Sequence, residues 1–237
     1  LVGAQFGDEG KGKEVDRRAA DFDLVVRFGG GPNAGHTLRN EFGEIKLHLV
    51  PSGICHQKVM NVIGAGVAVD PQVLIAEIKM LSERVDPRCA ERILVSSRAN
   101  LLLPYHQALD LALEARRGAH SIGTTGRGIG PCFADRVSRN GLLIGNLLEL
   151  DSYQAQLYDL YCETHRFVED IYARFSVGTD PSSGFPGFEV MMENLRAQAE
   201  FLRPLIADTG DYLRAANRQG KFILLEGAQG TLIDLYE

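Results

Sequence analysis

The chain has 237 residues, of which 45% are hydrophobic, and its formal net charge is −6. That hydrophobic share is ordinary for a globular protein with a core, and the length suits one large domain or two small ones. The negative charge excludes an overall basic field for holding nucleic acid, so an anionic ligand needs a local site. No apolar stretch approaches the ~20 residues that cross a bilayer, so no membrane contact is predicted.

The cysteines and the two ends of the chain lead to two further expectations. Cys55, Cys89, Cys132 and Cys162 lie far apart without a Cys-x-x-Cys pair, which argues against a zinc site and predicts reduced thiols in the cytoplasm. The chain begins with Leu1 rather than Met and ends soon after a glycine-rich turn. We therefore expect residues 1–237 to be an incomplete single α/β domain.

The first predicted feature is a loop rich in glycine and lysine at residues 3–13, between the end of a strand and a helix. Its glycines let backbone N–H groups approach an anion, and the helix N-terminus adds partial positive charge. The Walker A pattern is not met, because Gln5 replaces a glycine and Gly12 follows Lys11 where Ser or Thr is needed. Asp8 is therefore a candidate for holding Mg²⁺. Alternatively, the glycines only shape a turn and the acids only favour a helix start.

A second loop follows the strand predicted at residues 24–28. Its three consecutive glycines, residues 29–31, are costly unless the backbone bends or approaches another group closely. Asn33, His36 and Thr37 then offer an amide, an imidazole and a hydroxyl together. The His can donate a proton or a hydrogen bond to a developing phosphoryl oxyanion. The alternative is a His that caps a turn or packs in a cleft wall.

The middle of the chain alternates strands with helices. A helix opens at Asp70, as N-cap, with Pro71 at its first position. Residues 105–117 form another helix, ended by Gly118. Further strands are predicted at residues 46–50, 59–63, 93–96 and 222–225.

Two more polar loops are candidate ligand sites. Residues 122–131 combine Thr hydroxyls, glycine amides and Arg127, a set that suits phosphate. The alternative for this loop is a flexible surface lid. Gln229, in the turn at residues 226–231, can both donate to and accept from a purine edge, or it is simply an exposed turn residue.

Two long helical patterns, at residues 147–174 and 189–219, make residues 147–219 a mainly helical subregion. The Gly-, Pro- and Ser-rich residues 176–187 between them are predicted to be an exposed loop. The alternation elsewhere predicts an α/β fold: a mostly parallel central sheet flanked by helices, with a long helical excursion in the second half. Ligands in such folds bind at the carboxyl ends of the strands.

Several motifs taken together resemble those of the adenylosuccinate synthetases. Residues 5–13 are similar to the family signature QWGDEGKGK, with Phe6 in place of Trp. The resemblance extends over the whole chain, more loosely at residues 153–202, and implies a fold like that of the P-loop NTPases. The other matching segments follow in the order of the family, at residues 33–37, 49–53, 122–131 and 226–232.

The resemblance implies a two-step ligation that joins L-aspartate to IMP. GTP phosphorylates O6 of IMP, and the amino group of aspartate then displaces that phosphate at C6, giving adenylosuccinate, GDP and phosphate. Asp8 is the implied general base on the purine N1 proton, and His36 is the implied acid beside the transferring phosphoryl group. A base suits this chemistry, because removing the N1 proton places charge on O6 and makes it a better nucleophile.

The resemblance also implies sets of binding residues. One Mg²⁺ per subunit is held by Asp8 and the carbonyl of Gly35. GTP is the co-substrate, and its site comprises Gly7, Asp8, Glu9, Gly10, Lys11, Gly12, Lys13, Gly35, His36 and Thr37. IMP contacts Asp8, Glu9, Gly10, Lys11, Asn33, Ala34, Gly35, His36, Thr125, Arg139 and Gln229. Arg139 reaches the IMP of the other subunit of a homodimer.

The chain departs from the family pattern at several positions. Glu14 replaces an apolar residue that faces the sheet, and burying it unpaired is costly. Pro32 stiffens the second loop, Tyr236 stands where the family usually has Asp, and the loop at residues 176–187 has no counterpart. The family also extends well beyond this chain, into the segments that bind aspartate and read guanine, so activity of the fragment alone is doubtful. Two alternatives therefore stay open: a non-catalytic purine-nucleotide-binding remnant, and a phosphotransferase with another acceptor.

Overall fold

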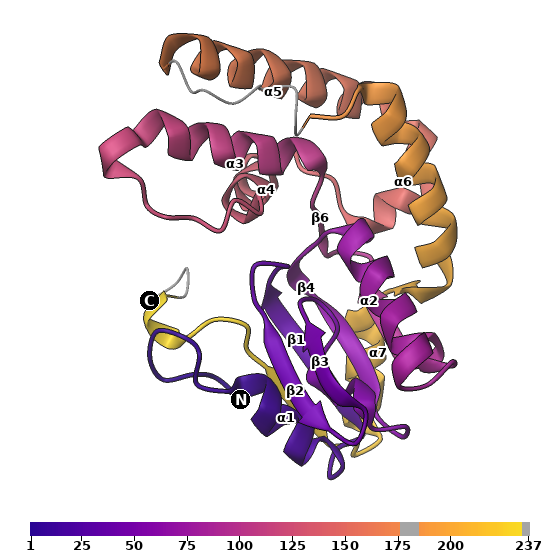
Figure 1. Ribbon diagram of the computed structural model, residues 1–237. Helices are drawn as coiled ribbons and strands as arrows, with labels where there is room; N and C mark the ends of the chain where they lie inside the picture. Colours follow the sequence, from indigo (N-terminus) through magenta and orange to yellow (C-terminus); the bar gives the residue numbers. More distant parts are fainter. Residues whose placement is uncertain (176–184, 234–237) are drawn as a thin grey trace.

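The computed structural model describes residues 1–175 and 185–233, so Tyr236 lies outside the described residues. A parallel sheet forms the centre of its lower half (Figure 1), with strand order β7-β5-β4-β1-β8 and β6 paired to the far end of β4. The strands are β1 (Leu24–Gly30), β4 (Met60–Val69), β5 (Ile93–Ser96), β6 (Asn100–Leu101), β7 (Ile206–Ala207) and β8 (Ile223–Glu226). The predicted α/β fold with a mostly parallel sheet is confirmed.

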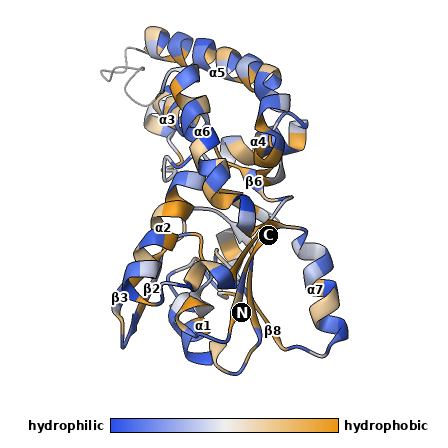
Figure 2. Ribbon diagram, turned by 90° about the vertical axis from the view of Figure 1, so that its right-hand side faces the viewer, coloured by the Kyte–Doolittle hydropathy of each residue, from blue (hydrophilic) through white to orange (hydrophobic). Residues whose placement is uncertain are grey.

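Alternation along β1 explains why helices cover both faces of the sheet. Val25 packs with the apolar side of α1 (Lys11–Ala19), whereas Val26 packs with α7 (Thr209–Arg218) through Ala216. Successive side chains of a strand point to opposite faces, so an unbroken apolar strand needs a cover on each side. Figure 2 shows α1 and α2 on one side of the sheet and α7 on the other.

The helix predicted to open at Asp70 is confirmed as α2 (Pro71–Arg84). The Asp70 carboxylate accepts from the backbone N–H groups of Gln72 and Val73, at 2.9 and 3.3 Å, and so satisfies donors that the first turn leaves free. The residues that recur at helical spacing, namely Leu74, Ile78 and Leu81, are all buried in the core.

The strand predicted at residues 46–50 is wrong in its second half. β2 (His36–Asn40) and β3 (Gly43–Leu47) form a separate antiparallel hairpin, and the sequence analysis missed β2. Beyond Leu47 the backbone N–H groups of Leu49 and Val50 turn to the buried carboxylate of Glu77, at 3.1 and 2.9 Å. A side chain on α2 therefore replaces the neighbouring strand that an apolar run normally requires.

The helical half lies beyond the carboxyl ends of β4 and β6 (Figure 1). The pattern predicted over residues 189–219 is interrupted by the short strand β7, so that range is not one helix. The remaining helices are α3 (Pro104–Arg117), α4 (Ile129–Ser138), α5 (Gln154–Phe175) and α6 (Phe188–Leu202). Short 3-10 segments are η1 (Ser52–Cys55), η2 (Cys89–Arg92), η3 (Gly118–His120), η4 (Ile144–Tyr153), η6 (Arg203–Leu205) and η7 (Thr231–Ile233).

Only the end of the loop predicted at residues 176–187 can be compared, because residues 176–184 lie outside the described residues. Phe185 is buried rather than exposed, and its ring meets that of Tyr161 edge-on with centroids 5.0 Å apart. Tyr161 also donates a hydrogen bond of 3.0 Å to the carbonyl of Pro186. An aromatic contact therefore fixes the entry to α6, which composition alone did not indicate.

Candidate functional site

The first loop and the turn after β8 lie side by side at the edge of the sheet. The amino group of Leu1 donates to the carbonyl of Leu225 at 2.5 Å, and the N–H of Gly227 donates to the carbonyl of Leu1 at 2.9 Å. Gly3 and Gly230 then form a parallel bridge. Two segments more than 220 residues apart in the chain are thereby joined at the carboxyl ends of the strands, where the fold class predicts ligands.

Gly12, in the first turn of α1, places the first loop against His36. A β-carbon on Gly12 would lie 2.6 Å from Cβ of His36 and 2.9 Å from its Cγ, which is closer than atoms can pack. His36 is 8% exposed at the start of β2, and Lys11 is 6% exposed beside Gly12. The absent side chain therefore brings the backbone of the first loop into contact with the imidazole of the second.

Gly30 makes the second close approach of the site. Its φ is +77°, and a β-carbon there would lie 3.0 Å from the side-chain nitrogen of Gln229. Gln229 is half-buried, so its amide stands beside the second loop as well as at the end of β8. The structure thus brings together the first loop, the second loop and Gln229. The other predicted residues of the second loop follow at its rim, where Asn33, Gly35 and Thr37 are exposed and Ala34 is half-buried.

The third loop meets the second through Arg127. Arg127 and Pro32 line one cavity of about 330 Å³, together with His48. Thr125 is exposed, and Arg139 is exposed at the C-cap of α4 with a left-handed φ of 66°. The structure gives neither of these two residues a contact with the first loop. Their predicted roles toward IMP stay predictions.

A carboxylate of the chain itself occupies the N–H donors of the first loop. Oε1 of Glu9 accepts from the backbone N–H groups of Gln5 and Gly7, at 3.1 and 3.0 Å, and its Oε2 lies 3.1 Å from Nζ of Lys11. The hydrogen bonds from Gly7 and Lys11 hold the pKa of Glu9 at about 2. The donors of Gln5, Gly7 and Lys11 therefore hold the carboxylate of Glu9, and the predicted binding of phosphate by this loop stays a prediction.

The third loop repeats this arrangement with Glu114 of α3. The Glu114 carboxylate accepts from the backbone N–H groups of Gly123 and Thr124, at 2.8 and 3.4 Å. The Thr124 hydroxyl donates at 3.1 Å to Asp110, which also accepts from the N–H of Gly128. The donors that were predicted to suit phosphate thus serve carboxylates from the neighbouring helix.

We expect the amide signal of Gly7 to report the ionisation of Glu9. The pKa of Glu9 is lowered from 4.5 to about 2, so the ionised form is favoured by folding. The associated stability is fully present above pH 4.5 and is lost as the pH falls through about 2. A pH series of amide NMR spectra should show the Gly7 shift changing near pH 2. Glu9→Gln should remove that change, and a midpoint near 4.5 in the parent protein would contradict the contact.

Asp8 and Gly35 are the residues predicted to hold a metal ion. Asp8 is exposed and has a left-handed φ of 58°, next to Gly7 with φ 104°, so a strained turn presents its carboxylate to solvent. Within residues 1–175 and 185–233, no three His, Cys, Asp or Glu side chains gather as a metal cage. Mg²⁺ is commonly held by one or two carboxylates together with substrate phosphates, so an exposed carboxylate and a carbonyl fit this ion.

His36 is part of a buried polar cluster that the sequence analysis missed. Its Nδ1 lies 2.5 Å from Oε1 of Glu226, and that oxygen also accepts from the Ser52 hydroxyl at 2.6 Å. Burial alone would raise the pKa of Glu226, but the hydrogen bonds from His36 and Ser52 hold it below its ordinary value. The available signal was a Glu that ends an apolar strand, because a charge there requires buried partners.

Glu14, which stands where the family has an apolar residue, is partly exposed and paired, so it carries no penalty for burying an unpaired charge. Its side chain is 34% exposed and pairs with Arg17 at 2.7 Å and with Arg18 one position further along α1. These hydrogen bonds from Arg17 and Arg18 lower the pKa of Glu14 to about 2. The next turn of the helix supplies two guanidinium groups, so the carboxylate is not left unpaired.

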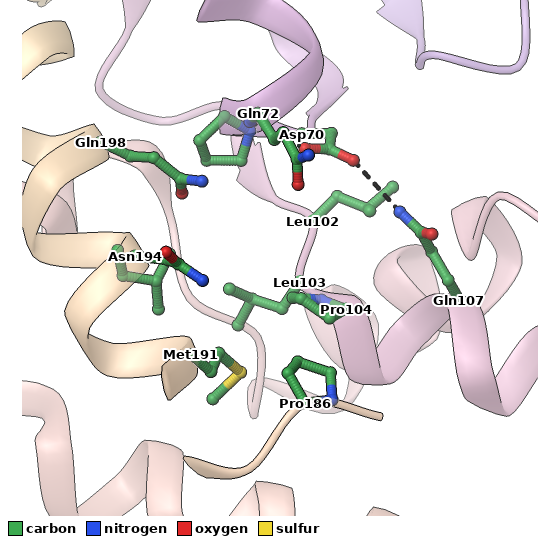
Figure 3. Close-up of a pocket in the computed structure, with 12 residues that line it drawn as sticks. Asp70, Gln72, Leu102, Leu103, Pro104, Gln107, Pro186, Met191, Asn194 and Gln198 are labelled. Atoms are coloured by element: carbon green, nitrogen blue, oxygen red, sulfur yellow. Dashed lines mark hydrogen bonds between the residues drawn. The ribbon is translucent and has the colours of Figure 1, made fainter. Parts of the chain in front are cut away.

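A second cavity, of about 290 Å³, lies between α2, α3 and α6, away from these loops (Figure 3). Asp70 and Gln107 face each other across one end, joined by a hydrogen bond of 3.1 Å. Neither this cavity nor the one beside Arg127 is lined by Asp8 or His36. The second and third loops thus meet at the cavity beside Arg127, whereas Asp8 and His36 lie outside both cavities.

Two further predictions can be compared with the structure. All four cysteines are free, and Cys55, Cys89 and Cys132 are buried. Among the described residues, no helix combines the length and the apolar composition that crossing a bilayer requires.

Known proteins match both the sequence and the fold. The chain is 44% identical over 238 residues to the adenylosuccinate synthetases of Heliobacterium modesticaldum and Moorella thermoacetica, covering 99% of this chain and 52% of each relative. It therefore spans about half the length of the curated relatives it matches. Its structure resembles that of the fully ligated adenylosuccinate synthetase of Plasmodium falciparum, with a TM-score of 0.83 and 29% identity over 99% of this chain and 52% of that one.

A more distant structure shares the fold alone. The succinoaminodeoxyadenylate synthetase of cyanophage S-2L, bound to dGMP and dATP, is 22% identical with a TM-score of 0.59, again over 99% of this chain and 52% of that one. The model of the family "Adenylosuccinate synthetase" matches residues 1–237, so the chain belongs to the adenylosuccinate synthetase family.

Proposed function

We propose that this chain provides the IMP-binding and phosphoryl-transfer side of an enzyme that ligates L-aspartate to IMP with the energy of GTP. One observation carries the proposal: Gly12 packs the anion-binding loop directly against His36, at the carboxyl edge of the sheet. Gln229 stands at the same edge, beside Gly30. An oxyanion cradle, an imidazole and an amide are thus assembled where a purine nucleotide and a triphosphate can meet.

The residues of this edge suit the first of the two steps, the transfer of the γ-phosphoryl group of GTP to O6 of IMP. Asp8, on the exposed turn, takes the N1 proton of IMP, so that charge develops on O6 as it attacks the γ-phosphorus of GTP. The bond from that phosphorus to the GDP oxygen then breaks, and His36 donates a hydrogen bond to the transferring group. Phosphoryl transfer otherwise depends on positioning and on charge neutralisation, which Lys11 and the backbone N–H groups of the first loop supply.

Mg²⁺, when bound, would neutralise phosphate charge beside the carboxylate of Asp8 and the carbonyl of Gly35. The remaining residues of the first loop, from Gly10 to Lys13, hold phosphate through backbone N–H groups and ammonium charge. We also propose a homodimer in which Arg139, exposed at the end of α4, reaches the IMP phosphate of the second subunit. A guanidinium matches the geometry of a phosphate well. We also propose that the enzyme lies in the cytoplasm, because the spacing of its cysteines predicts reduced thiols.

The assay that tests this proposal uses the product of the whole gene with IMP, GTP and L-aspartate. Release of GDP that depends on both IMP and aspartate, with formation of adenylosuccinate, is the expected result. GDP release without aspartate incorporation would instead indicate a phosphotransferase with another acceptor. Binding of IMP and GTP without any turnover would indicate a non-catalytic remnant. Either of these two outcomes would overturn the proposed ligation.

A further inference from the structure

Ser52 and Glu226 surround one ring nitrogen of His36 inside the protein. Glu226 is fully buried at the end of β8, and Ser52 is fully buried in the 3-10 turn that follows the hairpin. Nδ1 of His36 lies 2.5 Å from Oε1 of Glu226 and 3.3 Å from the hydroxyl oxygen of Ser52. The imidazole therefore has two polar neighbours at Nδ1. Its other nitrogen, Nε2, is buried without a hydrogen-bond partner among the described residues.

The proton at Nδ1 can be assigned by counting donors. The single hydrogen of the Ser52 hydroxyl points to Oε1 of Glu226, at 2.6 Å, so the Ser52 oxygen can only accept from the imidazole. The Glu226 carboxylate, which is ionised, can also only accept. Both neighbours of Nδ1 are thus acceptors, and Nδ1 must carry a hydrogen. In the neutral ring Nε2 is then the unprotonated nitrogen.

We propose that Glu226 is a positioning residue that fixes the orientation of His36 and keeps the proton at Nδ1, so that Nε2 alone faces the transferring phosphoryl group and donates to it from the positively charged ring. The inference rests on the proposed function for its consequence, but the tautomer itself stands on the geometry of the cluster. A carboxylate that orients an imidazole in this way also stabilises the positive ring, as the Asp of serine-protease triads does.

A backbone donor fixes the carboxylate of Glu226, so the effect of Glu226→Gln on the tautomer of His36 can be predicted. The backbone N–H of Ser52 donates to Oε2 of Glu226 at 2.9 Å, and a backbone donor cannot be reversed. In Glu226→Gln the amide oxygen must keep this bond, so the NH₂ group takes the place of Oε1 and points to Nδ1 of His36. A donor facing Nδ1 forces that nitrogen to be unprotonated, and the proton moves to Nε2.

The test is an ¹⁵N NMR measurement of the His36 imidazole in its neutral form. The parent protein should show Nδ1 protonated and Nε2 unprotonated, and Glu226→Gln should show the reverse. Ser52→Ala is the matched control, because it removes a hydrogen bond from the same cluster but keeps the carboxylate, so the parent pattern should persist. A protonated Nε2 in the parent, or an unchanged pattern in folded Glu226→Gln, would overturn the assignment. Should Glu226→Gln not fold, the spectrum of the parent alone decides.

Turnover of the whole-gene product adds a readout that a merely structural role would not produce. Glu226→Gln should lower kcat by about 10²–10⁴-fold with KM for IMP nearly unchanged, because a neutral amide no longer stabilises the positively charged ring that donates to the phosphoryl group, and this is the range for a positioned acid or base. Combining it with His36→Asn should cost no more than His36→Asn alone. Additive losses, or a loss confined to KM, would count against positioning. If the parent lacked aspartate-dependent turnover, the proposed ligation would fail while the NMR result still decided the tautomer.

Discussion

Turnover is expected to fall by about 10²–10⁴-fold when Asp8 is replaced by Asn in the whole-gene product, because the amide cannot accept the N1 proton of IMP. The fold should be retained. Asp8 is exposed and adopts a left-handed φ of 58°, and Asn is among the few residues that tolerate this region as well as Asp does. Initial rates of GDP release with saturating IMP, GTP and aspartate measure the effect.

Asp21→Asn provides the matched control for that substitution. It makes the same chemical change at another exposed carboxylate, beyond the end of α1 and away from the first loop. Its turnover should equal that of the parent protein, and the urea unfolding midpoints of both variants should lie close to the parent value. If Asp8→Asn kept full activity, Asp8 could not be the base, because an amide at this position cannot accept the N1 proton.

Gly12→Ala is expected to reduce turnover by about 10²-fold or more, since a displacement of about 1 Å in a catalytic group has that effect. The new β-carbon would lie 2.6 Å from Cβ of His36 and 3.1 Å from the hydroxyl oxygen of Ser52. His36 is held to Glu226 on its other side and cannot yield freely. Overpacking of this kind costs about 1–3 kcal/mol of unfolding free energy, which outweighs the gain of up to about 1 kcal/mol from alanine in a helix.

Gly187→Ala is the control that separates the effect of the clash at Gly12 from the general effect of replacing a glycine with alanine. Apart from its chain neighbours, no heavy atom of the described residues lies within 4 Å of the position that its β-carbon would take, and its backbone, with φ −54° and ψ 147°, is open to any residue. Urea unfolding should show a change below about 1 kcal/mol, and turnover should be retained. Equal losses in the two variants would mean that Gly12 is not held against His36.

Local patterns predicted most of the sheet and the start of α2. Residues 93–96 form a strand within the predicted bounds, and Asp70 caps α2 through the N–H donors expected of an N-cap. Both features are determined by residues that are close together in the sequence, so a local sequence pattern is enough to predict them. The strand at residues 46–50 was misplaced because the competing acceptor, Glu77, lies nearly thirty residues away in the chain.

The candidate site was predicted only as a set of separate loops. Residues 3–13, His36 and Gln229 each carried a signal, and the fold placed them on one edge of the sheet. Glu226 and Ser52 lie in segments that resemble the family, but neither was assigned a role, because the importance of a buried carboxylate appears only with the imidazole it meets. Thr125 and Arg139 were assigned through the family resemblance, and their roles toward IMP stay predictions.

The carboxylate of Glu9 competes with any phosphate that binds the first loop. Phosphate that uses the N–H groups of Gln5 and Gly7 must first detach an anion that is covalently part of the same loop. Such a tethered competitor is present at an effective concentration in the millimolar range or above, and the apparent affinity for phosphate is the intrinsic affinity multiplied by the fraction of molecules in which Glu9 is detached. Entry of the ligand is thus an exchange of one negative group for another, which favours multiply charged phosphates over singly charged anions of the cell.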